Sequence, residues 1–263
     1  MTTSRIYIIA GLLLLARLAH AQVTGRYFFS RHTSASGLAA NEVNDVVQDP
    51  EGFIWIATTG GLQRYDGVRF TSFRNQKNNP STLPGNVVSD LHGDRSGNLW
   101  VQVMGNRVGT FDIHSFRFRE AAIKPSKPEM INSDKRFSVD EQGNLMMVLW
   151  NNELLTYNPN RNEFSPAANF IYVPAGWKVT GVCQIPGTSR YIVGTMTGMA
   201  IYNRKTERLS YAGHNLDQDP LVDKIGKITM ASNLLIDHKG RLWFDTWENG
   251  SSTVVCYDLA RQS

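Results

Sequence analysis

The sequence contains few cysteines and no periodic pattern of a fibrous protein. Only Cys183 and Cys256 occur among 263 residues, so a disulfide-dense scaffold is excluded. The two could form one disulfide in an oxidising compartment, or both could be small buried residues in strands. No Gly-X-Y period or heptad run is present, which excludes collagen and coiled coil, and a hydrophobic content of 41% excludes a disordered chain.

The sequence also has no large excess of positive or negative residues. Lys and Arg number 27 against 23 Asp and Glu, and Arg5 and Arg17 lie in an N-terminal segment that we expect to be removed. The remaining 25 basic and 23 acidic residues leave a net charge of +2. The basic residues are scattered rather than clustered, so we do not predict nucleic-acid binding.

Motifs of catalytic and metal sites are missing as well. The six His residues show no His-x-x-x-His spacing, and no Gly-x-Ser-x-Gly elbow, phosphate-binding loop or Cys-His pair is evident. We therefore predict no catalytic residue, no metal ligand, no cofactor and no enzymatic activity. Calcium at the repeated Asp turns described below is an alternative, but no complete Asp-x-Asp-x-Asp loop occurs.

The N-terminal segment has the pattern of a secretory signal. Arg5 precedes the apolar run 6–15, and Ala19-His20-Ala21 supplies small residues at the positions that a signal peptidase recognises. The run has 10 residues, too few to span a ~30 Å hydrocarbon core. We predict a signal peptide over residues 1–21 and a mature chain over 22–263; an uncleaved anchor is the alternative, which Arg17 favours. No later stretch approaches ~18 apolar residues, so any membrane attachment would need a segment downstream of this chain.

A repeat of about 46 residues dominates the rest of the chain. The segment 41–56 recurs 45 positions later as 86–101, with Asp-x-x-Gly followed by a Trp-centred apolar run in both copies. A third copy carries Met146 in place of the Trp, a fourth is weaker, and a fifth is strong again. An aromatic residue followed by Asp or Asn comes 10 to 14 residues after each Trp position. A period of this length indicates an array of identical structural units.

Each unit contains four short apolar runs separated by turns, which is typical of a propeller blade. The turns of the first unit all contain Gly, which adopts positive φ without a Cβ clash. They are Asp-x-x-Gly, Gly60-Gly61 and Asp66-Gly67. We predict an all-β propeller of about five four-stranded blades. The expected blades cover residues 36–75, 81–119, 131–166, 177–211 and 228–263.

The ends of the array leave two arrangements open. A shift of 45 residues superposes Tyr27-Phe28 on Ser72-Phe73, which predicts a leading outer strand at 25–30. The fifth unit is one strand short. The leading strand could complete that unit and close a five-blade ring, which removes exposed strand edges. Alternatively, the units form part of a seven-blade ring that continues beyond Ser263.

The first unit closely resembles the two-component regulator propeller repeat. The likeness rests on the lead-in 37–43, on Asp49-Pro50-Glu51-Gly52-Phe53-Ile54-Trp55, and on 61–67; the second and fifth units are similar, and the third and fourth are weaker. The resemblance implies the N-terminal periplasmic sensor region of a hybrid two-component histidine kinase. It also implies an oligosaccharide as ligand, and a kinase located outside this chain.

Candidate binding residues are those that depart from the repeat. Trp150 and Trp247 lie in hairpins outside the Trp column, and Trp177 precedes the fourth unit. Their rings could stack on sugars, or they could fill gaps between blades. Arg64 and Arg107 could reach an acidic sugar, or they could be solvated surface residues.

We predict a non-catalytic periplasmic ligand-sensing propeller that binds an oligosaccharide and could form a homodimer through the propeller. A secreted enzyme or lectin-like module that acts on or binds polysaccharide is the alternative. A fragment that folds poorly is a third interpretation.

Overall fold

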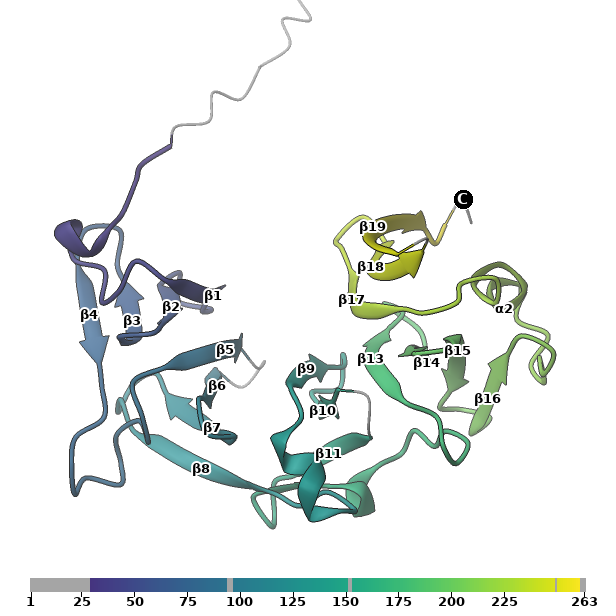
Figure 1. Cartoon of the computed structure of the whole chain (residues 1–263), viewed down its shortest axis with the longest axis horizontal. Coiled ribbons are helices and arrows are strands. Elements are labelled where there is room, and N and C mark those ends of the chain that lie inside the picture. The colour runs from purple at the N-terminus through teal and green to yellow at the C-terminus, as the bar shows by residue number, and fades with distance from the viewer. Residues whose placement is uncertain (1–28, 94–96, 151–152, 249, 261–263) are drawn as a thin grey trace, which may run out of the picture.

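The protein is described by a computed structural model that covers residues 29–93, 97–150, 153–248 and 250–260. The predicted signal peptide and residues 25–28 of the predicted leading strand lie outside the described residues, and residues 29 and 30 have no regular secondary structure. Almost every element is a strand, and the strands form sheets that follow one another along an arc (Figure 1). The predicted all-β fold with propeller-like blades is confirmed.

The first four blades are meanders of four antiparallel strands, and the fifth has three strands. The blades consist of β1 (Val43–Gln48), β2 (Ile54–Thr58), β3 (Gly61–Tyr65) and β4 (Phe70–Phe73); β5 (Val88–Gly93), β6 (Asn98–Val103), β7 (Arg107–Asp112) and β8 (Phe118–Ile123); β9 (Lys135–Val139), β10 (Leu145–Leu149), β11 (Leu154–Asn158) and β12 (Glu163–Ser165); β13 (Val179–Gln184), β14 (Arg190–Thr195), β15 (Gly198–Asn203) and β16 (Arg208–Tyr211); and β17 (Ser232–Ile236), β18 (Arg241–Glu248) and β19 (Ser251–Asp258).

In the described part of the chain, one short helical element precedes β1 and the others lie between strands. They are η1 (Ser34–Ser36), η2 (Pro128–Asn132), η3 (Pro166–Ala168) and α2 (Pro220–Ile225). No helix among the described residues is long and apolar enough to cross a membrane.

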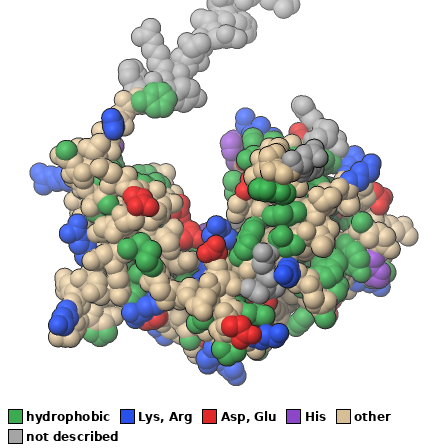
Figure 2. Space-filling view, in the orientation of Figure 1, with side chains coloured by type: hydrophobic (Ala, Val, Ile, Leu, Met, Phe, Trp, Pro, Cys, Tyr) green, Lys and Arg blue, Asp and Glu red, His purple; other side chains and the backbone are tan. Residues whose placement is uncertain are grey.

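The arc is open. The β1–β4 sheet and the β17–β19 sheet face each other across a gap in Figure 1, and no strand pair joins them among the described residues. The described residues thus form an open arc, and residues 25–28 of the leading strand that would close a five-blade ring lie outside them. The first strand of each blade lies on the concave side of the arc (Figure 1). The space-filling view is hollowed on this side, which we call the central hollow (Figure 2).

The repeated Asp fixes the turn between the first two strands of a blade. Asp49 Oδ1 accepts hydrogen bonds from the backbone N–H groups of Glu51 (3.0 Å) and Phe53 (2.9 Å), and Gly52 has a φ of 92°. Asp49 Oδ2 accepts a 2.7 Å bond from Trp55 Nε1. The same carboxylate therefore orients both the turn and the Trp that follows it. We call the side of the arc that carries these turns the turn face, and the side that carries the hairpins after β2, β6, β10, β14 and β18 the hairpin face.

The Trp column packs the blades against one another. Trp55 is fully buried, and its ring lies 5.6 Å from the rings of Phe73, in its own blade, and Phe111, in the next blade. Burial of one such side chain stabilises the fold by roughly 2–3 kcal/mol. The second and third blades are joined differently, because β8 and β12 pair in parallel at their outer edges and make one eight-stranded sheet.

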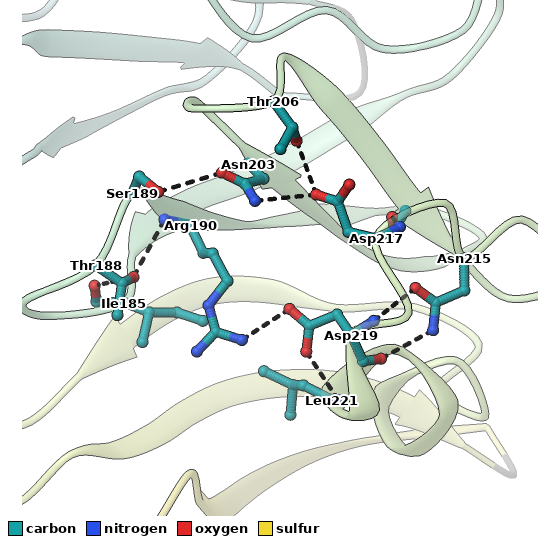
Figure 3. Close-up of polar contacts among 11 residues, drawn as sticks. Ile185, Thr188, Ser189, Arg190, Asn203, Thr206, Asn215, Asp217, Asp219 and Leu221 are labelled. Carbon is teal, nitrogen blue, oxygen red and sulfur yellow. Dashed lines mark hydrogen bonds and ion pairs between the residues drawn. The ribbon is translucent and has the colours of Figure 1, made fainter.

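An insert between β16 and β17 fills the last blade boundary. The predicted blades leave residues 212–227 without an assigned element, but this segment contains α2, whose Leu221, Val222 and Ile225 are buried. Asp219 holds the insert in place: its carboxylate caps α2 at Leu221 N (3.0 Å) and pairs with Arg190 at 2.7 Å (Figure 3). The helix was missed because six residues carry too little periodicity to detect.

Candidate functional site

The three predicted Trp residues lie at the hairpin face but in three different surroundings. Trp247 is 56% exposed on β18. Trp177 packs edge-on against Tyr211, with 4.9 Å between ring centroids, and joins the core of the fourth blade. Trp150 is half-buried in the hairpin after β10, beside residues that are not described. Trp177 is thus part of the packing of the fourth blade, and of the three residues only Trp247 exposes more than half of its surface to solvent.

The predicted Arg64 lies at the opposite, turn face. Its guanidinium carbon lies 4.4 Å from the ring centroid of Phe53 and 5.0 Å from that of Phe116. Phe116 belongs to the next blade, so Arg64 fills the boundary between two blades through cation–π contacts. The other candidate arginine, Arg107, donates from Nε and Nη2 to the two carboxylate oxygens of Glu120 (Nε to Oε1, 2.9 Å). The structure therefore does not bring the sequence-predicted residues together into one site.

The central hollow brings together polar side chains from four blades. Asp45, Asp90 and Arg136 occupy equivalent positions on β1, β5 and β9, opposite the penultimate residue of the second strand. Arg136 Nε donates to Asn233 Oδ1 of the fifth blade at 3.4 Å. Asn233 in turn donates to Asp245 Oδ2 at 2.6 Å. Figure 2 shows acidic and basic side chains meeting at the floor of the hollow.

Asp45 and Asp90 form a carboxyl pair in this hollow. Asp45 Oδ2 accepts a 2.8 Å hydrogen bond from Leu91 N, which fixes it against the neighbouring inner strand. Burial, a hydrogen bond with Asp45 and the charge of Asp45 raise the pKa of Asp90 to about 7, and Arg136 opposes this shift. Asp90 therefore keeps its proton at acidic pH and up to near neutral pH.

A cavity of about 530 Å³ lies at the turn-face end of the same strands. Its lining comes from four blades: His92 on β5, Phe137 on β9, Gln184 on β13 and Leu235 on β17 contribute, and Glu141 adds a carboxylate. Leu235 is 61% exposed although it is apolar. Acceptors, donors and an aromatic ring thus converge on a concave space, which is the usual composition of a small-molecule site.

Nucleophile and metal chemistry have little support in this hollow. Cys183 also lines the cavity, but burial raises the pKa of its thiol to about 12, so it stays protonated. Cys256 is exposed, contrary to the expectation that both cysteines are buried, and neither cysteine is in a disulfide. Within the described ranges, no group of three or more His, Cys, Asp and Glu residues is placed to hold a metal ion.

Sequence reasoning did not identify the hollow, although part of its signal was present. Asp45 and Asp90 are separated by the 45-residue period, so the repeat itself places them side by side on neighbouring inner strands. Arg136 and Asn233 carry no such signal, because the third and fifth units diverge from the repeat there.

Comparisons with known proteins agree with the repeat and with the fold. Residues 37–60 match the family model described as the two component regulator propeller. No curated protein sequence gives a significant match. The resemblance stated from the first unit is thus confirmed for that repeat.

Solved structures share the fold at low sequence identity. The extracellular domain of the hybrid two-component system BT3049 from B. thetaiotaomicron superposes with a TM-score of 0.64 and 16% identity, over 90% of this chain and 31% of that one. The extracellular domain of the one-component system BT4673 from the same organism gives 0.56 and 16%, over 84% and 30%. The Dos1 propeller gives 0.53 and 15%, over 89% and 61%. The chain thus spans about a third of the length of the two extracellular domains, and the propeller fold is shown.

Proposed function

We propose that this chain is a non-catalytic, ligand-sensing propeller region of a periplasmic two-component sensor, and that its ligand is an oligosaccharide bound in the central hollow. The observation that carries the proposal is the convergence of four blades on the 530 Å³ cavity. A ligand that contacts several blades at once can bias their relative positions, which is what a sensor requires.

The chemistry of the cavity suits a sugar. Glu141 and Gln184 offer hydrogen-bond acceptors and donors for hydroxyl groups, while Phe137 and Leu235 offer apolar surface for the C–H face of a pyranose. The matched repeat and the likeness to extracellular domains of bacterial sensor systems support a sensory role outside the cytoplasm. Transmission of the signal would belong to other parts of such a system.

A glycan-cleaving enzyme is the second candidate, because the Asp45–Asp90 pair places a carboxyl group of raised pKa in the hollow. Glycosidases hold their two carboxyl groups at least about 5 Å apart so that the glycosidic bond fits between them. Asp45 and Asp90 are hydrogen-bonded to each other, and Asp45 is also engaged by Leu91 N. The geometry therefore favours a structural acid pair.

One titration series tests both functions. The mature chain is titrated calorimetrically with a panel of neutral and acidic oligosaccharides, and each mixture is then assayed for new reducing ends. The proposal predicts saturable binding of at least one oligosaccharide class without new reducing ends. Release of reducing ends that disappears in Asp90→Asn would support the enzyme, and absence of binding across the panel would contradict the sensor proposal.

A further inference from the structure

The turn-face boundary between the first and second blades is filled by a side-chain plug. The plug consists of Phe53, Arg64 and Phe116, with the guanidinium lying against both rings. Arg64 pairs with Trp55 across β2 and β3, so the plug sits directly beside the Trp column. Phe116 adopts a φ of 58°, a conformation that bulky residues rarely take. This boundary is closed.

The equivalent boundary between the second and third blades has lost all three members of the plug. Asn98 stands two residues before Trp100, as Phe53 does before Trp55. Thr110 pairs with Trp100 as Arg64 pairs with Trp55. Asn162, with a φ of 49°, takes the turn position of Phe116 and accepts a hydrogen bond from the Tyr157 hydroxyl. The replacements are smaller and polar.

A cleft of about 420 Å³ occupies the space that the plug would fill. The half-buried ring of Tyr157 forms its base and packs edge-on against the buried Trp100, with 4.7 Å between their ring centroids. Asn98, Thr110 and Asn144 supply polar wall groups. Arg119 stands on the adjacent position of β8, paired with Thr110, and is exposed.

Arg119 gives the cleft its charge. Within the described part of the chain it makes no ion pair, whereas Arg107 on the neighbouring strand is neutralised by Glu120. The cleft lining contains no Asp or Glu among the described residues. An exposed guanidinium beside amide and hydroxyl groups favours a carboxylate, and the aromatic base favours a ring with an apolar face.

We propose that this cleft is a binding site for a carboxylate-bearing pyranose, with the sugar ring over Tyr157 and the carboxylate on Arg119. The site is separate from the central hollow, because it lies between β7 and β11 on the turn face. The second and third blades contribute to both sites, but with different residues. It exists because the second boundary lacks the plug that closes the first.

The experiment measures binding of galacturonate and of galactose to the full chain by isothermal titration calorimetry. The wild type is expected to bind galacturonate more tightly, and Arg119→Gln is expected to lose about tenfold or more in galacturonate affinity, so that the two sugars become equivalent. The double variant Asn98→Phe, Thr110→Arg rebuilds the plug and is expected to abolish binding of both sugars while the melting temperature is maintained.

Arg64→Thr is the matched control, because it opens the first boundary and leaves the second unchanged; its galacturonate affinity is expected to equal that of the wild type. Arg136→Ala, in the hollow, is expected to behave in the same way, which separates this site from the proposed sensor site. The proposal is overturned if the wild type binds neither sugar, if Arg119→Gln retains the preference for galacturonate, or if a folded plug variant still binds.

Discussion

The Tyr191 hydroxyl donates a 2.7 Å hydrogen bond to Asp140 Oδ2 across the boundary between the third and fourth blades. In the first and fifth blades the equivalent carboxylate is satisfied within its own blade, by Trp55 Nε1 and Trp243 Nε1. The third blade has Met146 at that position, which offers no donor. Asp140 Oδ2 is instead shared by Asn144 Nδ2 of its own blade (2.6 Å) and by the Tyr191 hydroxyl of the next blade. Burial together with the bond to Asp140 raises the pKa of Tyr191 to about 12.

Loss of this hydroxyl should destabilise the fold. Tyr191 and Asp140 are almost completely buried, so Tyr191→Phe removes a charge-assisted hydrogen bond from a carboxylate that water does not reach. We expect the free energy of unfolding to fall by about 1–3 kcal/mol in a denaturant titration. Tyr65→Phe is the control, because the Tyr65 hydroxyl binds Gly67 O at an exposed turn and should change stability by less than about 0.5 kcal/mol. Equal effects of the two variants would contradict this account.

The carboxyl pair in the hollow predicts an unusual dependence of stability on pH. The folded-state pKa of Asp90 is about 7, raised from 3.8, so between pH 4 and 7 the folded chain holds a proton that the unfolded chain has released. The contribution of Asp90 to the free energy of unfolding is therefore fully present below pH 4 and is lost as the pH rises through 7. We expect the wild type to lose stability relative to Asp90→Asn over this window, measured by denaturant titration at each pH. A difference between the two that is constant with pH would contradict the raised pKa of Asp90.

Lys135 should be a strong determinant of stability despite its charge. It is fully buried on β9, and burial lowers its pKa to about 8. Its Nζ donates to Asn106 Oδ1 (2.7 Å), Ile131 O (2.7 Å) and Ser133 O (3.0 Å). Lys135→Met leaves these acceptors unsatisfied.

We expect Lys135→Met to reduce the free energy of unfolding by about 2–4 kcal/mol. Lys205→Met, at an exposed position on the turn face, should change it by no more than about 0.5 kcal/mol. Thermal unfolding followed by circular dichroism compares the two, and a Lys135→Met protein as stable as the wild type would show that the three bonds add nothing.

The repeat made the fold predictable because it fixes local structure. Asp49 and Gly52 specify a turn, Trp55 specifies the buried strand that follows, and their recurrence specifies the sheets. The site was not predictable in the same way. Arg136 and Asn233 meet only because the arc curves, and curvature depends on packing at all blade boundaries together.

Residues that depart from the repeat were predicted as ligand contacts, and the structure places them in different surroundings. Trp177 departs from the repeat for packing, and Arg64 closes a boundary through Phe53 and Phe116. From the sequence alone, a residue that differs from the repeat and fills a blade boundary cannot be told apart from one that leaves the boundary open. Only the pairing of Thr110 with Trp100 shows where a filling residue is absent.

The most direct test of the central claim blocks the hollow and measures ligand binding. Leu235 lines the cavity and is 61% exposed, so Leu235→Lys places a charged side chain in the binding space at little expected cost to stability. Val254 on β19 is 66% exposed and does not line the cavity, which makes Val254→Lys the matched control. For an oligosaccharide that the wild type binds, calorimetry should show an affinity reduced about tenfold or more in Leu235→Lys and unchanged in Val254→Lys. Unchanged affinity in Leu235→Lys would contradict a binding site in the central hollow.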